Sequence, residues 1–188
     1  MKTFKNFIAE SAYTDGVKSG KHGIYDSHSH SSIMLPGYVK GHVDFYVGHD
    51  KGPHADKARY YANKVEQHLK ERSFASTNHD RALNDIYHNA MNAHIEKHVR
   101  GSNAYTLSAE HHDKVVEKAE NHHKNINDLK KVVGYSAENE KKIRQHQDAL
   151  NAARDAKNTR GSFSSSKGIY LKSKFDSLSD KANKDWFL

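Results

Sequence analysis

The sequence predicts a mainly α-helical protein, a bundle of about four helices with a small N-terminal β-hairpin and a flexible N-terminal tag. From residue 53 onward, apolar residues recur at helical spacing. Clusters of Gly, Ser and Asn separate these stretches. Hydrophobic residues make up only 35% of the 188 residues, and the mean hydropathy is -0.97. We therefore expect one helical domain with a thin core over residues 24–153.

Two segments precede the predicted helices. Residues 11–23 are small and polar and contain glycine, so we expect a flexible linker. Residues 24–50 carry weakly alternating apolar residues around Tyr38 and from Val43 to Val47, with Pro36 next to a glycine as a turn signal. Alternation between glycines indicates short strands, so the β-hairpin is expected here.

Four helices follow, each with an apolar stripe and a start signal. Pro53 suits a first helical position, Thr77 or Asn78 could cap the second helix, and Ser108 and Ser136 could cap the third and fourth. The inward residues should be Ala58, Tyr61, Ala62, Val65, Leu69, Leu83, Ile86, Tyr87, Ala90, Met91, His94, Val115, Ala119, His122, Ile126, Leu129, Val133, Ile143, Ala149, Leu150 and Ala153.

The C-terminal region, residues 154–188, combines a low-complexity segment up to residue 168 with an apolar tail. The tail contains Phe175 and Trp186, which we expect to dock on the bundle.

No apolar run approaches the roughly 20 residues that span a bilayer, so we expect no membrane partner. Cysteine is absent, which excludes disulfide and thiolate chemistry.

The first residues form a short amphipathic peptide. Phe4, Phe7 and Ile8 stand at i, i+3 and i+4, so one helical turn would place them on one face. Lys5 and Asn6 interrupt the apolar run, which excludes the continuous core of a secretory signal. The peptide ends in Ile8-Ala9-Glu10, followed by the small residue Ser11. This pattern indicates a targeting tag followed by a cleavage site.

Residues 1–10 resemble the capsid-targeting peptide of the internal head proteins of T-even-type bacteriophages. The matching residues are Met1, Lys2, Thr3, Phe4, Phe7, Ile8, Ala9 and Glu10. The resemblance implies that residues 1–10 are a propeptide that directs the chain to the prohead core, and that the head maturation protease cuts the Glu10–Ser11 bond. It also implies a location inside the phage head and, after infection, in the host cytoplasm, where the protein would act on a host factor. A prohead scaffold component is the alternative.

The charge balance favours a polyanionic neighbour. Lys and Arg number 30 against 23 Asp and Glu, for a net charge of +7. Removal of residues 1–10 deletes Lys2, Lys5 and Glu10, which leaves 7 - 2 + 1 = +6. We therefore expect non-specific association with packaged DNA. The 16 His residues could add positive charge beside DNA or at mildly acidic pH.

One segment could bind a metal. Asp26, His28 and His30 lie in an Asp-x-His-x-His arrangement, and two His separated by one residue in an extended segment project to the same side. The motif resembles the opening of metal-dependent phosphoesterases of the polymerase-and-histidinol-phosphatase type, whose barrel this chain is too short and too helical to form. A small metal-dependent hydrolase remains the second alternative, with further ligands from His42, His49 or Asp44.

Other His pairs are weaker candidates. His94 and His98 stand one helical turn apart and could chelate a metal, or could simply share a half-buried helix face. The adjacent pairs at 111–112 and 122–123 should splay around a helix.

No nucleophile elbow, phosphate loop or dinucleotide fingerprint is present, so no catalytic residue is assigned. Leu69-Lys70-Glu71 repeats the minimal cleavage pattern, but we expect helix formation to protect it, leaving one cut at Glu10.

Overall fold

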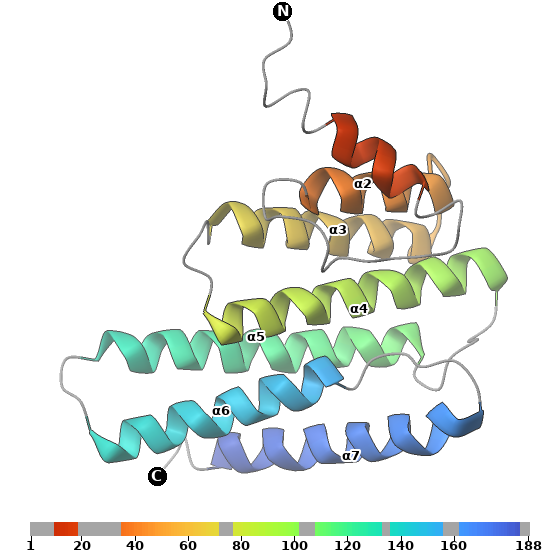
Figure 1. The fold of residues 1–188 in the computed structure, drawn as a ribbon. Coiled ribbons are helices and arrows are strands. Elements are labelled where there is room, and N and C mark those ends of the chain that lie inside the picture. Colours follow the sequence, from red (N-terminus) through yellow and green to blue (C-terminus); the bar gives the residue numbers. More distant parts are fainter. Residues whose placement is uncertain are drawn as a thin grey trace, which may run out of the picture. The chain divides into compact units, whose positions relative to one another are not determined.

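The chain is helical throughout the part that the structure describes (Figure 1). This computed structural model describes residues 10–18, 35–71, 77–101, 108–132, 136–155 and 162–184. A helix over residues 10–18 precedes α2 (Leu35–Tyr46), α3 (Pro53–Glu71), α4 (Asn78–Arg100), α5 (Ala109–Lys131), α6 (Ala137–Asp155) and α7 (Ser162–Lys184). The predicted mainly α class is therefore confirmed, and helices α3 to α6 are those expected from residue 53 onward.

The predicted β-hairpin is wrong for the described part of its region. Residues 35–46 form α2, a turn follows at residues 47–49, and residues 24–34 lie outside the described ranges. The buried residues of this region are Tyr38, Val39, His42, Val43 and Val47. Their spacing of i, i+1, i+4, i+5 and i+9 is helical once His42 is counted as a core residue. The alternation was misleading because it covered only a few residues.

Glycines bring the helix at residues 10–18 close to α2. A Cβ atom on Gly16 would lie 2.0 Å from the carbonyl oxygen of Tyr38, and one on Gly41 would lie 2.1 Å from that of Tyr13. Ala12 is fully buried in the same helix. The two helices thus meet backbone against backbone, which only glycine permits. Residues 11–18 are therefore a packed helix where a linker was expected, and residues 19–23 lie outside the described part.

The chain divides into two compact units, where one helical domain was expected. Unit one comprises residues 1–75 and 94–102, and unit two comprises residues 76–93 and 103–188. Helix α4 therefore begins in unit two and ends in unit one. In unit one α2 packs against α3. Its core is built from small and medium-sized side chains, namely Ala12, Tyr38, Val39, Val43, Val47, Ala55, Ala58, Tyr61, Val65 and Ile95.

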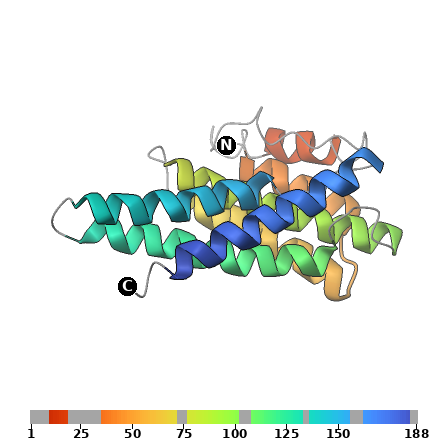
Figure 2. The same cartoon turned by 90° about the horizontal axis from the view of Figure 1, so that it is seen from below.

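In unit two α6 packs against both α5 and α7, and α7 runs obliquely across α6 (Figure 2). Phe175 of α7 is fully buried, with the Lys118 ammonium 5.7 Å from its ring centre. Residues 162–168, expected to be low-complexity coil, lie within α7, and Trp186 lies outside the described residues. The larger buried apolar residues of this unit are Leu83, Ile86, Met91, Val115, Ile126, Leu150 and Phe175.

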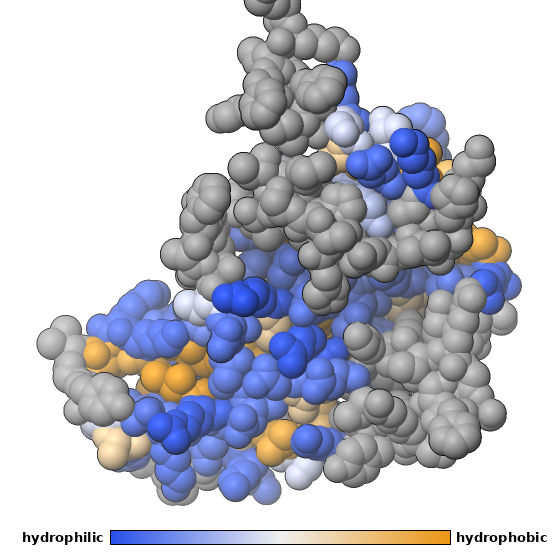
Figure 3. All heavy atoms as spheres, viewed as in Figure 1, coloured by the Kyte–Doolittle hydropathy of each residue, from blue (hydrophilic) through white to orange (hydrophobic). Residues whose placement is uncertain are grey.

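Most of the surface that the described residues present is hydrophilic. On the face drawn in Figure 3, hydrophobic side chains form small separate patches among hydrophilic ones. The most exposed large hydrophobic residue is Val132, at 58%. A polar surface around a core rich in Ala and His accounts for the low mean hydropathy of -0.97.

Side-chain caps start three of the helices, as the sequence predicts. The Ser108 hydroxyl accepts a hydrogen bond from the His111 amide at 3.1 Å, and the Ser136 hydroxyl accepts one from the Asn139 amide at 3.0 Å. At the start of α4, the Asp80 carboxylate accepts a hydrogen bond from the Thr77 amide at 2.9 Å. Gly101, with φ of +64°, follows α4 in the left-handed conformation typical of a helix end.

The Ser108→Ala substitution should lower the free energy of unfolding by about 1 kcal/mol, because it removes the side-chain acceptor of the His111 amide at the start of α5. Urea unfolding followed by circular dichroism measures this change. Ser177→Ala is the matched control, since Ser177 is exposed within α7, where alanine is an equally good or better helix former. Equal stabilities of the two variants would contradict the capping role.

Candidate functional site

The predicted cleavage junction is exposed. Glu10 and Ser11 are the first two described residues of the helix over residues 10–18, and both are exposed. The Glu10 carbonyl oxygen accepts a hydrogen bond from the Thr14 hydroxyl at 2.9 Å. Ile8, Ala9 and the predicted targeting face of Phe4, Phe7 and Ile8 lie outside the described residues. The junction thus lies on the surface, where a protease could reach it.

The predicted metal segment with Asp26, His28 and His30 also lies outside the described residues. Of the suggested further ligands, His42 is buried in α2, where its ring stacks on Tyr38 and meets the edge of Tyr46. Burial lowers the pKa of His42 to about 4. His49 is exposed in the turn that follows α2, and Asp44 is half-buried. His42 thus serves as an aromatic core residue of unit one.

His94 and His98 each have a partner in another segment of unit one. The Nδ1 atom of His94 lies 3.0 Å from Nδ1 of His54, at the start of α3. The Nε2 atom of His98 lies 3.1 Å from a carboxylate oxygen of Asp50, just before α3. Sequence reasoning identified the pair on α4 but missed His54 and Asp50. Asp50 precedes the helix, so no helical-face argument could have placed it beside His98.

A second His pair lies in the core of unit two. Nδ1 of His122 in α5 lies 2.8 Å from Nδ1 of His146 in α6, and its Nε2 lies 2.8 Å from the Ser179 hydroxyl of α7. Burial lowers the pKa of His122 to about 4, assisted by the charges of His146 and Lys118. Burial also lowers the pKa of His146. One nitrogen of the His–His contact must carry the proton and the other must accept it, so the arrangement suits two neutral rings.

The chain Ser179–His122–His146 has the order of a nucleophile, a base and a group that orients the base. A catalytic role needs access for substrate, yet all three side chains are at most 1% exposed. The cluster therefore stabilises the packing of α5, α6 and α7. His146 and Ser179 were missed by sequence reasoning, because a polar residue within an apolar stripe carries no signal of burial.

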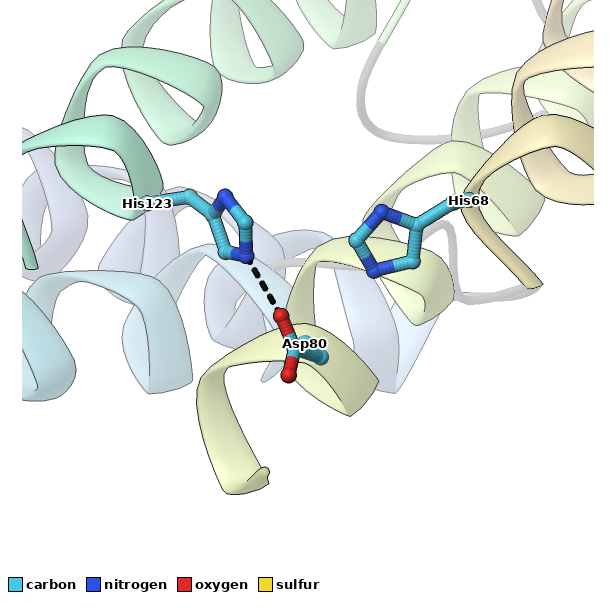
Figure 4. A group of neighbouring side chains, drawn as sticks. All are labelled: His68, Asp80 and His123. Carbon is cyan, nitrogen blue, oxygen red and sulfur yellow. Dashed lines mark hydrogen bonds and ion pairs between the residues drawn. The ribbon is translucent and has the colours of Figure 1, made fainter. Parts of the chain in front are cut away.

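The third cluster joins the start of α4 to α5 (Figure 4). One carboxylate oxygen of Asp80 lies 2.7 Å from Nε2 of His123, and the other accepts a hydrogen bond from the Thr77 hydroxyl at 2.6 Å. Burial raises the pKa of Asp80, but the hydrogen bonds from Thr77 and His123 outweigh it and hold that pKa well below its usual range. Asp80 is thus an ionised, buried anchor that also caps α4.

Two further residues complete this cluster. The Asn127 side chain lies 3.3 Å from ring nitrogens of both His79 and His123. The pKa of His79 is lowered, first by burial and then by the charge of Lys130. His122 and His123 therefore point to different helices, as expected for adjacent residues: His122 faces α6 and α7, and His123 faces α4.

Burial changes the expected contribution of His to positive charge. Among the His residues that the structure describes, nine are buried, namely His42, His68, His79, His88, His94, His112, His122, His123 and His146. Where burial lowers the pKa, as for His42, His79, His122 and His146, the ring stays neutral at pH values where a free His is charged. These four His therefore add less positive charge beside a polyanion than free His would while the chain stays folded.

No protein-family model matches the chain, and neither the curated proteins nor the solved structures give a significant match. None of the helices that the structure describes is long and apolar enough to cross a bilayer.

Proposed function

We propose that this chain is a bacteriophage internal head protein that residues 1–10 direct to the prohead core and that the head maturation protease trims after Glu10. The observation that carries the proposal is the N-terminal peptide, with Phe4, Phe7 and Ile8 on one side and Ile8-Ala9-Glu10 before Ser11. The exposed position of Glu10 and Ser11 supports a cut at this bond.

The trimmed body suits packaging beside DNA. It keeps a net charge of +6 after loss of Lys2, Lys5 and Glu10 (7 - 2 + 1), and phosphate neutralisation by Lys and Arg requires no base reading. After ejection into the host cytoplasm the body would act on a host protein.

The proposal requires a single cut. The sequence Leu69-Lys70-Glu71 also has an apolar residue two positions before Glu, but it forms the last turn of α3. Amide groups in the last turn of a helix are hydrogen-bonded to carbonyl oxygens four residues earlier. The bond after Glu71 therefore follows hydrogen-bonded helix, whereas Glu10 and Ser11 are exposed.

N-terminal mass spectrometry of the protein from purified phage heads tests the proposal. We expect Ser11 as the first residue in mature particles, an uncut chain for Glu10→Gln, and normal cutting for the control Glu71→Gln. Intact Met1 in mature particles would overturn the targeting role. Presence in immature proheads with loss from mature particles would instead assign the chain to the scaffold.

A further inference from the structure

Unit one contains two neighbouring pairs of side chains that could bind a metal, between the start of α3 and the end of α4. We call the two pairs the rungs of a ladder. One rung joins His54 and His94, whose Nδ1 atoms lie 3.0 Å apart. The other joins Asp50 and His98, with 3.1 Å between carboxylate oxygen and Nε2. His94 and His98 are four residues apart on α4, so their side chains project from the same face one turn apart. The two pairs are neighbours along α4, but no three of these four ligand atoms lie within 4.8 Å of one another, so a shared ion would require side chains to move.

The spacing of the first rung is close to that of a metal chelate. Two nitrogens on a tetrahedral Zn²⁺, each about 2.0–2.1 Å from the metal, are about 3.3 Å apart. The Nδ1 atoms of His54 and His94 need to separate by only a few tenths of an ångström to admit such an ion between them. In a neutral pair one of these nitrogens must keep a proton, whereas a metal ion would bind the lone pairs of both.

The second rung would have to supply the remaining ligands. His94 is 1% exposed, whereas the side chains of His98 and Asp50 are 22% and 67% exposed and are therefore free of tight packing that would prevent a change of rotamer. A rotation of His98 and Asp50 toward the His54–His94 pair would complete four ligands. Imidazole ligands select Zn²⁺ and its transition-metal neighbours over Mg²⁺ and Ca²⁺.

The turn before α3 is held in place from outside the ladder. Arg59 donates hydrogen bonds to the carbonyl oxygens of Gly48, at 3.0 Å, and Asp50. Arg59 also pairs with the Asp56 carboxylate at 2.9 Å. The guanidinium is thus occupied by backbone carbonyls and by Asp56, while the Asp50 carboxylate faces His98. Such outer contacts fix the orientation of a ligand, as in known metal sites.

We propose that His54, His94 and His98, with Asp50 as fourth ligand, form a binding site for a divalent transition metal such as Zn²⁺. The ion would join the start of α3 to the end of α4 within unit one. The site uses none of the residues Asp26, His28 and His30, and it does not depend on the proposed packaging function. The buried pair His122–His146 has a similar Nδ1–Nδ1 distance of 2.8 Å, but its third neighbour is the Ser179 hydroxyl, a poor ligand for Zn²⁺.

Titration of the untagged full chain with Co²⁺ and Zn²⁺ at pH 7.5 tests the site. We expect about one equivalent of Co²⁺ bound, with the visible absorption of tetrahedral nitrogen and oxygen ligation, and displacement by Zn²⁺. His98→Asn and Asp50→Asn should weaken binding by at least roughly 10-fold. His98 and Asp50 are partly exposed, so these variants should keep the circular dichroism of the parent chain.

The double variant His28→Asn/His30→Asn is the matched control and should bind the first equivalent as the parent chain does. Absence of Co²⁺ binding would overturn the proposal, and so would binding that is lost in this control but kept in His98→Asn. Loss in His98→Asn with retention in the control would support it.

Discussion

Lowering the pH from 7 to 5 should destabilise both units of the protein, because buried His side chains resist protonation in the folded state. His42 in unit one and His122 in unit two have pKa values lowered to about 4, against about 6.5 in an unfolded chain. At pH 7 both states are neutral and no penalty exists. Below pH 6.5 the unfolded state takes up protons that the folded state does not, so stability falls until the pH reaches about 4.

The size of this loss is large for small helical units. Each of the two side chains should reduce the free energy of unfolding of its unit by about 2 kcal/mol at pH 5 and by about 3 kcal/mol well below pH 4. The lowered pKa values of His79 and His146 add to the loss in unit two. Asp80 has a lowered pKa, so its contribution is lost only below about pH 4 and adds nothing to the loss between pH 7 and pH 5. Against a total stability of about 5–15 kcal/mol, these losses should lower the urea midpoint of both units at pH 5.

Urea unfolding at pH 7 and pH 5, followed by circular dichroism, measures this loss. His42→Leu removes one titrating group from the core, so it should reduce the difference between the two pH values, even if it changes stability at pH 7. His49→Gln is the matched control, because His49 is exposed three residues after α2 and should leave the difference unchanged. Equal free energies of unfolding at pH 7 and pH 5 would contradict the prediction.

The Gly41→Ala substitution should separate the helix over residues 10–18 from α2. The added methyl group would lie 2.1 Å from the carbonyl oxygen of Tyr13, a backbone atom that moves only if the whole helix moves. Gly16→Ala should act in the same way, since its Cβ would lie 2.0 Å from the Tyr38 carbonyl oxygen. Overpacking of this kind costs about 1–3 kcal/mol, more than the better helix propensity of alanine returns.

Hydrogen exchange of the amides of residues 12–18 measures this detachment, and these amides should exchange faster in both variants. Thr14→Ala is the control within the same helix, because Thr14 is exposed and its replacement leaves the contact with α2 intact. Detachment should also make the Glu10–Ser11 bond easier to extend, so the glycine variants should be cut faster by the head protease. Unchanged exchange in Gly41→Ala would show that the helices separate readily in the parent chain.

Local patterns were sufficient for the helices from residue 53 to residue 155. In α3 to α6 the apolar stripe has the helical period, and polar residues such as Ser108 and Ser136 mark the starts. The same reasoning failed for α2 and for residues 10–18. There, glycine is a helix-packing residue and His42 is part of the core, and both are usually taken as signs of exposure or of turns.

The sequence alone determines the composition, the basic charge and the N-terminal peptide. It also determines the caps and apolar stripes of α3 to α6, because a cap or a stripe depends only on residues that are close in sequence. The pairing of His54 with His94, of His122 with His146 and of Asp80 with His123 could not be read in this way. These partners stand 24 to 43 residues apart, and only the packing of one helix on another brings them within hydrogen-bonding distance. Whether a His is a surface charge or a neutral core residue is decided by that packing, because burial removes the water that stabilises its charged form.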